Sequence, residues 1–174
     1  MSLGQTMLSI ATLVALTIMV VTSQRYLIEG QKEAVSAECL DLATMQSEAL
    51  LAEITRKLYD ANVTYTYYQS TDEFTGAYSL GPSSSERALV SPWPDLKPYK
   101  SISAFSDVDD YNTYERTVDT NLISGIRLTV EVYYVDEDNP STKVYYKTYM
   151  KRVVVTAQHT TYLEHISFGT VVSY

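Results

Sequence analysis

The hydrophobic and polar positions at the start of the chain predict a helix that is apolar on every side. No Lys, Arg, Asp, Glu or His occurs from Gln5 to Gln24, and the first charged residue is Arg25. About 20 such residues in a helix rise roughly 30 Å, which is the thickness of the hydrocarbon core of a bilayer. Such a helix needs lipid or other helices around it.

Beyond Arg25 the pattern changes to that of a helix with one buried stripe, because apolar residues recur at steps of three to five. The expected stripe consists of Val35, Cys39, Leu42, Met45, Leu50, Ile54 and Leu58. No proline precedes Pro82, and Gly30 is a candidate kink. We therefore expect one helix over residues 5–60, about 84 Å long. A coiled-coil stalk is the alternative for its second half, although clean heptads are absent.

Residues 61–174 have the composition of a β-rich head. Segments rich in β-branched and aromatic residues, or alternating in polarity, predict strands. They are Val63–Tyr68, a hairpin of Ile126–Val135 and Lys143–Val155, and an edge strand at Gly169–Tyr174. Ser, Gly and Pro residues predict a surface loop over Ser70–Lys100. The fold class expected is α+β, with the amphipathic half of the helix packed on a small antiparallel sheet.

Composition narrows the classes of partner. The net charge is −8 and the pI is near 4.7, so an acidic surface disfavours nucleic acid. Cys39 is the single cysteine, which makes an intrachain disulfide impossible. The head must therefore be stabilised by its hydrophobic core alone. On the helix stripe, Cys39 is expected to pack as a small apolar residue. The 16 tyrosines are typical of a β-domain with a tyrosine-rich surface.

Candidate chemistry is sparse. The acidic loop with Asp107, Asp109, Asp110 and Asn112 is a weak Ca²⁺ candidate without the glycine and terminal glutamate of an EF-hand, and a solvated loop is the simpler expectation. Asn62 begins an N-glycosylation sequon. His159 and His165 have no nucleophile or carboxylate at motif spacing, and no phosphate loop or dinucleotide fingerprint occurs. We expect no enzyme, cofactor or metal centre.

The long two-part helix, together with Gly4 and the following Gln5-Thr6-Met7-Leu8-Ser9-Ile10, resembles the type IV pilin superfamily. The resemblance implies a leader, residues 1–4, that is cut after Gly4 to leave Gln5 as the new N-terminus. Bacterial pilins usually carry Phe first and Glu fifth after the cut. Gln5 and Ser9 stand there in this chain, so we expect a divergent pilin, an archaeal-like filament protein, or a chain that is numbered without its full leader.

The resemblance further implies a filament outside the cell, assembled from copies of the chain by a dedicated machine after a stage in the inner membrane. The filament core would be formed by residues 5–24, and its expected members are Met7, Leu8, Ile10, Leu13, Val14, Leu16, Ile18, Val20 and Val21. Three alternatives remain for this segment: a cleaved secretory signal, a helix in the protein's own core, or the anchor of a single-pass extracytoplasmic binding protein.

Overall fold

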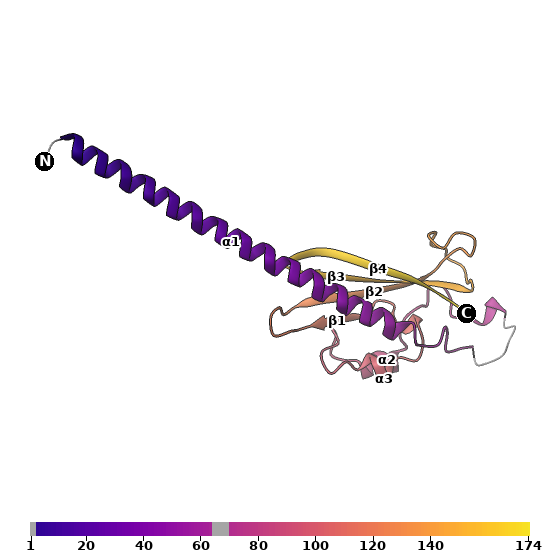
Figure 1. Ribbon diagram of the computed structural model, residues 1–174. Coiled ribbons are helices and arrows are strands. Elements are labelled where there is room, and N and C mark those ends of the chain that lie inside the picture. The colour runs from indigo at the N-terminus through magenta and orange to yellow at the C-terminus, as the bar shows by residue number, and fades with distance from the viewer. Residues whose placement is uncertain (1–2, 64–69) are drawn as a thin grey trace. The chain divides into compact units, whose positions relative to one another are not determined.

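The structure is a computed structural model that describes residues 3–63 and 70–174 (Figure 1). The chain divides into two units, residues 1–38 and 39–174, and each is considered by itself. The predicted α+β fold class is confirmed by a long N-terminal helix and a four-stranded antiparallel sheet. The predicted strand at Val63–Tyr68 falls mostly on residues outside the described ranges.

The N-terminal helix α1 runs from Leu3 to Ile54 and is continuous through Gly30, where a kink was expected. It ends before the predicted residue 60. The Lys57 amide bonds to the Ile54 carbonyl at 3.0 Å, which tightens the last turn. Leu58 then pairs with the loop at Asp107 instead of continuing the helix. A tertiary pairing therefore overrides helical propensity at this end.

The head is built on the sheet β1-β2-β3-β4, in which all neighbours are antiparallel. Its strands are β1 (Glu115–Val118), β2 (Ile126–Tyr134), β3 (Met150–His159) and β4 (Leu163–Ser173). Short helices η1 (Thr71–Glu73), α2 (Ser84–Leu89), α3 (Ser101–Ala104) and η2 (Asp109–Tyr111) lie in the connections. Figure 1 shows the end of α1 lying along the four strands.

The predicted hairpin is correct for its first strand and wrong for the start of its second. β3 begins at Met150, not at Lys143, which forms only a single bridge with Val135. The next residue, Val144, is buried in a cluster with Phe74 and Tyr134, so the segment leaves the ladder to fill the core. The edge strand is present, but β4 begins at Leu163 and not at Gly169.

The buried stripe of α1 differs in part from the predicted one. Its fully buried members are Cys39, Ala43, Ser47, Leu50 and Ile54. Met45 is 63% exposed and Leu58 is 46% exposed, contrary to expectation. Small side chains take the central positions, and the Ser47 hydroxyl donates to the Ala43 carbonyl at 2.7 Å. A helix with small residues at the contact can approach a sheet closely.

The expected surface loop at Ser70–Lys100 contributes to the core. Phe74 and Val90 are buried, at 2% and 0% exposure. The segment also contains α2, which is started by a capping box between Ser83 and Glu86. This signature, a serine followed three residues later by glutamate, is visible in the sequence and predicts a helix start.

Candidate functional site

The first candidate site is the apolar surface of α1. All nine residues of the predicted filament core are exposed, between 46% for Val20 and 69% for Leu8 and Leu13. The helix is long and apolar enough to cross a membrane, and the apolar stretch that qualifies is not buried anywhere in the protein. The structure therefore gives no support to the alternative of a helix buried in the protein's own core, because residues 5–24 are exposed.

The hydroxyl groups in this segment are bonded within the helix. Ser9 donates to the Gln5 carbonyl at 2.9 Å, and Thr17 donates to the Leu13 carbonyl at 2.8 Å. Thr12 reaches the carbonyls of Leu8 and Ser9. Such bonds lower the cost of placing a hydroxyl in hydrocarbon, because the polar hydrogen already has an acceptor.

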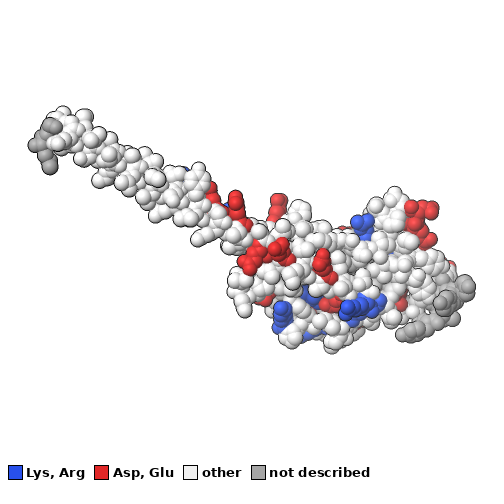
Figure 2. All heavy atoms as spheres, in the orientation of Figure 1, with Lys and Arg blue, Asp and Glu red and all other residues white. Residues whose placement is uncertain are grey.

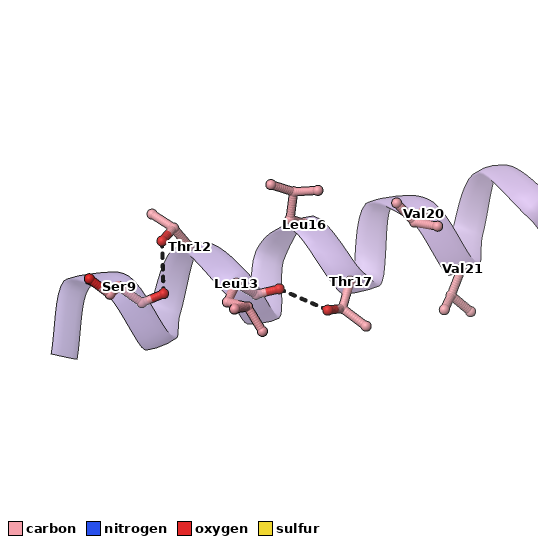
Figure 3. A pocket seen from close by; sticks show the side chains of 7 residues that line it. All are labelled: Ser9, Thr12, Leu13, Leu16, Thr17, Val20 and Val21. Atoms are coloured by element: carbon pink, nitrogen blue, oxygen red, sulfur yellow. Dashed lines mark hydrogen bonds between the residues drawn. The ribbon is translucent and has the colours of Figure 1, made fainter. Parts of the chain in front are cut away.

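A shallow groove runs along one side of this helix (Figure 3). It is lined by Ser9, Thr12, Leu13, Leu16, Thr17, Val20 and Val21. In Figure 3 the hydroxyls of Thr12 and Thr17 turn back to carbonyl oxygens of the helix, which leaves their methyl groups outward. Small and β-branched residues at such spacing allow another helix backbone to come near.

The charges on the protein surface are unevenly distributed (Figure 2). Acidic side chains are spread along the later part of α1 and none lies on its first part. We define the acidic helix face as Glu38, Asp41 and Glu48, which are exposed and lie opposite the buried stripe. Negative charge on this face has no role in packing α1 on the sheet.

Basic residues gather on the side of the head that carries α2 and α3 (Figure 2). We define the basic patch as the exposed residues Arg56, Arg87, Lys97 and Lys100. Arg87 lies over the Trp93 ring at 5.3 Å and Lys100 donates to the Ser91 carbonyl at 2.7 Å. From residue 87 to 106 the one acidic residue is Asp95, which is buried, so the patch is positive.

A buried ion pair connects α1 to the inner face of the sheet. Arg116 on β1 is 4% exposed and donates to Glu53 at 2.7 and 3.0 Å. Its guanidinium also lies 3.9 Å from the centre of the Tyr99 ring. Glu53 accepts a further bond from the Tyr111 hydroxyl at 2.7 Å. Glu53 lies outside the predicted apolar stripe, and the structure nevertheless turns it inward.

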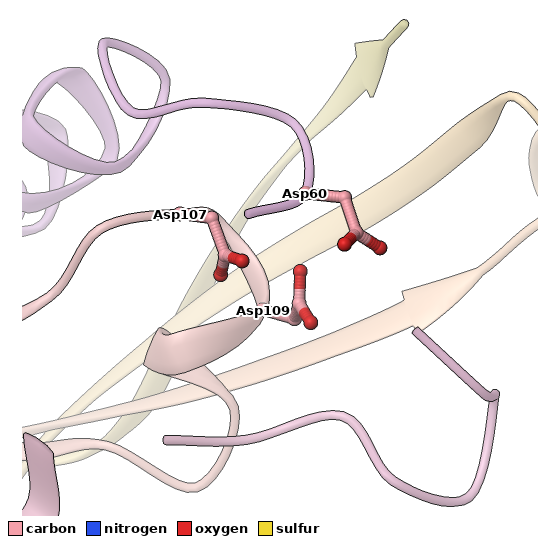
Figure 4. Close-up of side chains that lie close together, drawn as sticks. All are labelled: Asp60, Asp107 and Asp109. Atoms are coloured by element: carbon pink, nitrogen blue, oxygen red, sulfur yellow. The ribbon is translucent and has the colours of Figure 1, made fainter. Parts of the chain in front are cut away.

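A second buried cluster surrounds Lys151 on β3, which is fully buried. Its ammonium donates to Asp109 Oδ1 at 2.7 Å, to Asp60 Oδ2 at 3.3 Å and to the Tyr59 carbonyl at 2.8 Å. Carboxylate oxygens of Asp60, Asp107 and Asp109 lie within 4.8 Å of one another (Figure 4). In Figure 4 the three side chains point into the same space from the segment after α1 and from the loop around η2.

Burial raises the pKa of Asp107 in this cluster and of Asp110 beside it. Desolvation, followed by repulsion from Asp109 and Asp110, raises the pKa of Asp107 to about 8. Desolvation is also the largest cause that raises the pKa of Asp110. The Asp107 carboxyl is therefore largely protonated at neutral pH, which reduces the negative charge that the cluster must hold.

The four weak Ca²⁺ candidates do not converge. Asp107 and Asp109 meet, with Asp60 as the third carboxylate. Asp110 instead accepts bonds from the Ser106 and Asp107 amides, and Asn112 bonds to the Leu80 carbonyl and the Val132 amide. The expected solvated loop is also wrong, since the three aspartates are at most 5% exposed. The Lys151 ammonium supplies the positive charge beside Asp109, where the sequence suggested a weak Ca²⁺ candidate.

The remaining predicted residues lie on α1 and in the segment after it. Gly4 and Gln5 are both helical, and a cleavage between them stays a prediction. Asn62 is exposed and donates to Thr75 Oγ1 at 3.0 Å, whereas Thr64 of its sequon lies outside the described residues. Cys39 is fully buried on the helix stripe, as predicted.

Several tyrosines belong to the core, although a tyrosine-rich surface was predicted. Tyr59, Tyr111, Tyr114 and Tyr134 are buried, and burial is the largest cause that raises the pKa of each. Each hydroxyl finds an acceptor, such as the Thr148 carbonyl for Tyr59 at 2.8 Å. Tyr78 and Tyr145 are exposed and stack on each other. The tyrosines therefore serve both the surface and the core.

Sequence reasoning missed Arg116 and Lys151, although a signal for Lys151 exists. Alternate positions of β3 place Lys151 on the same face as Val153 and Val155, which are buried. Comparison with known proteins adds no assignment: no family model matches the chain, and no curated protein or solved structure matches it. The fold is compatible with a pilin-like or a membrane-anchored protein.

Proposed function

We propose that this protein is a structural subunit of an extracellular, type IV pilus-like filament and polymerises through its apolar N-terminal helix. The observation that carries the proposal is the uncovered apolar surface around the first part of α1, from Met7 to Val21. Burial of one Leu, Ile, Val or Met side chain contributes about 1.5–3 kcal/mol, so nine such residues provide a strong drive to find cover.

The subunit rests in the inner membrane before assembly, with residues 5–24 among lipid tails. A dedicated assembly machine then extracts it, and the helix exchanges lipid for helices of other copies. No charge has to be buried between Gln5 and Gln24, which keeps this exchange inexpensive. The groove in Figure 3 offers these helices a close approach. The subunit carries out no reaction on a substrate.

Charge complementarity supports a second contact between copies. The acidic helix face of one subunit can meet the basic patch of the next, since the two surfaces carry opposite charge and both are exposed. A contact between two different surfaces of identical chains is heterologous, and it generates an open helical polymer if the rotation does not close. The contact therefore suits a filament better than a closed dimer.

Electron microscopy of filaments sheared from cells, with peptide identification, tests the proposal. We expect this chain to be the main component of such filaments. Replacing Leu13 by Lys places a charge in the middle of the apolar segment and costs about 2.5–3.5 kcal/mol on membrane insertion, so filaments should be lost. The control Leu13→Ile keeps the segment apolar and should assemble. Filaments without this chain would contradict the proposal.

The alternative is a single-pass anchored, extracytoplasmic binding protein or a minor pilin-like component. Ser9 favours it, because this position holds no charge that could pair with a neighbouring subunit. Detergent extraction separates the two functions. An anchored binder is released as a monomer or small oligomer, whereas the filament subunit is sheared off as a polymer.

A further inference from the structure

Lys151 and Asp109 form a buried pair of an amine and a carboxyl group in contact. The Lys151 side chain is 0% exposed and that of Asp109 is 4% exposed, and Nζ lies 2.7 Å from Oδ1. Lys151 comes from β3 and Asp109 from η2, so the sheet and the loop hold the two groups independently. A nucleophile and an electrophile fixed at this distance have a high effective concentration.

Two aromatic rings lie against the Lys151 ammonium and cover the pair. The Lys151 ammonium lies 4.3 Å from the centre of the Tyr59 ring and 5.3 Å from that of Tyr134. Amide formation between the two groups requires transfer of one proton from the ammonium to the Asp109 carboxylate. The neutral pair consists of an amine with a free lone pair and a carboxylic acid, the two reactants of amide formation.

A third group, Asp107, is placed to carry protons. Its carboxylate oxygen lies within 4.8 Å of those of Asp60 and Asp109. Its two oxygens accept bonds from the Ala61 amide at 2.6 Å and the Asp110 amide at 3.1 Å, which fixes the carboxyl group. Burial raises the pKa of Asp107 to about 8, so a proton is available there at neutral pH. Proton transfer by a positioned group of this kind is general acid–base catalysis.

We propose that Lys151 Nζ condenses with Asp109 Cγ to form an intramolecular amide that joins β3 to η2. The ammonium passes one proton to the carboxylate, and the amine attacks Cγ to give a tetrahedral intermediate. Protonated Asp107 gives its proton to the departing hydroxyl and takes up the second proton of the nitrogen. The C–O bond breaks and one water leaves, so an ammonium and a carboxylate become an amide and water without any oxidant or reductant.

This cross-link would stabilise a head that cannot form a disulfide, since Cys39 is the single cysteine. The bond joins residues 42 positions apart and closes the loop between them in the unfolded chain. It also connects the C-terminal sheet to the segment that follows α1 through the contacts of Asp60 and Tyr59. The inference holds for the head whether or not the chain polymerises.

Mass spectrometry of the full-length chain extracted in detergent tests the cross-link. We expect an intact mass lower by one water than the mass calculated for the chain from its observed N-terminus. Trypsin should then yield a branched peptide in which residues 101–116 are joined to residues 148–152, with no cleavage after Lys151. Loss of water elsewhere in the chain lowers the mass equally, so the branched peptide shows whether the water was lost in the bond between Lys151 and Asp109. A chain at the full calculated mass would overturn the proposal, and a branch at Asp60 would overturn the assigned partner.

Variants distinguish the roles of the three residues. Lys151→Arg keeps the positive charge and Asp109→Ala removes the acceptor, and both should abolish the branched peptide. Lys147→Arg, at a lysine whose ammonium bonds to the Asp72 carbonyl, is the matched control and should retain it. Asp107→Asn should lower the cross-linked fraction at least tenfold in chains whose near-ultraviolet circular dichroism is native. Full cross-linking in that variant would overturn the role of Asp107 as proton carrier, and the wild-type mass decides the bond itself even where a variant fails to fold.

Discussion

At the scale of single residues, the inner face of the sheet contains two basic side chains that meet acidic partners from the end of α1, the segment after it and η2. Arg116 meets Glu53, and Lys151 meets Asp60 and Asp109. A buried ion pair adds little net stability compared with apolar residues of similar volume, but removing one partner leaves an uncompensated buried charge. The pairs therefore constrain how the chain can pack.

Removing the Glu53 carboxylate should destabilise the head. Glu53→Ala removes the carboxylate that accepts from Arg116 and from the Tyr111 hydroxyl, so we expect a loss of about 3 kcal/mol in the free energy of unfolding. Chemical denaturation followed by circular dichroism measures it. The control Glu48→Ala removes an exposed carboxylate from the same helix and should cost less than about 0.5 kcal/mol. Equal losses in the two variants would contradict the buried pair.

The titration of Asp107 predicts a pH dependence of stability. Its folded pKa of about 8 lies above the unfolded value of about 3.9, so the folded state binds more protons between these values. The contribution of Asp107 to stability is complete below the unfolded pKa and is lost as pH rises through the folded pKa. The free energy of unfolding should fall by up to about 1.4 kcal/mol per pH unit between pH 5 and 8, relative to Asp107→Asn.

Denaturant titrations of both chains across this range measure the difference. A difference that is flat, or that rises with pH, would contradict the raised pKa of Asp107. Condensation of Asp109 would remove one neighbouring charge but leave desolvation, which is the largest cause, in place. The sign of the dependence is therefore the same with or without the cross-link.

At the scale of elements, the sequence predicts that α1 is a long helix, but it predicts only part of the buried stripe. An apolar run followed by a periodic stripe predicts a long helix, and Cys39, Leu50 and Ile54 follow that stripe. Ala43 and Ser47 are missed, because a search for large apolar residues ignores small ones that permit close packing. The start of β3 is missed for a related reason, since Val144 fits a strand pattern and is buried elsewhere.

Overfilling the contact between α1 and the sheet should be costly. Ala43 is fully buried, so Ala43→Leu inserts three carbons into a packed contact and should cost about 1–3 kcal/mol. Ala49→Leu makes the same change at an exposed position of the same helix and should be close to neutral. Thermal unfolding of the two variants compares them. A neutral Ala43→Leu would show that α1 is not tightly packed at this point.

At the scale of the whole molecule, the sequence predicts the division into an apolar helix and a β-rich head better than it predicts the buried polar clusters of the head. The absence of charged residues before Arg25 can be read directly from the sequence, so the apolar helix is recognised without knowledge of the tertiary structure. The clusters around Arg116 and Lys151 depend on which strand faces and loops meet, and spacing along the chain does not specify this. The same holds for the basic patch, whose members come from the turn after α1, from α2 and from the segment before α3.

The proposed contact between the acidic helix face and the basic patch predicts a charge-swap result. Asp41→Lys with Glu48→Lys places like charges on both surfaces, and Lys97→Glu with Lys100→Glu does the same from the other side. Each exposed pair is worth about 0.2–1 kcal/mol, so either double variant should weaken assembly several-fold. The quadruple variant restores opposite charges and should recover assembly. Sedimentation of sheared polymer measures the assembled fraction.

Two features separate this contact from a general effect of charge. Glu164→Lys reverses an exposed charge on β4, outside both surfaces, and should leave assembly unchanged. Salt should weaken the wild type, because the screening length falls from about 10 Å at 0.1 M to about 3 Å at 1 M, whereas the apolar helix contact is insensitive to screening. A quadruple variant that assembles no better than the double variants would mean that the two surfaces do not meet. Polymer that persists in that case would then depend on the apolar helix alone.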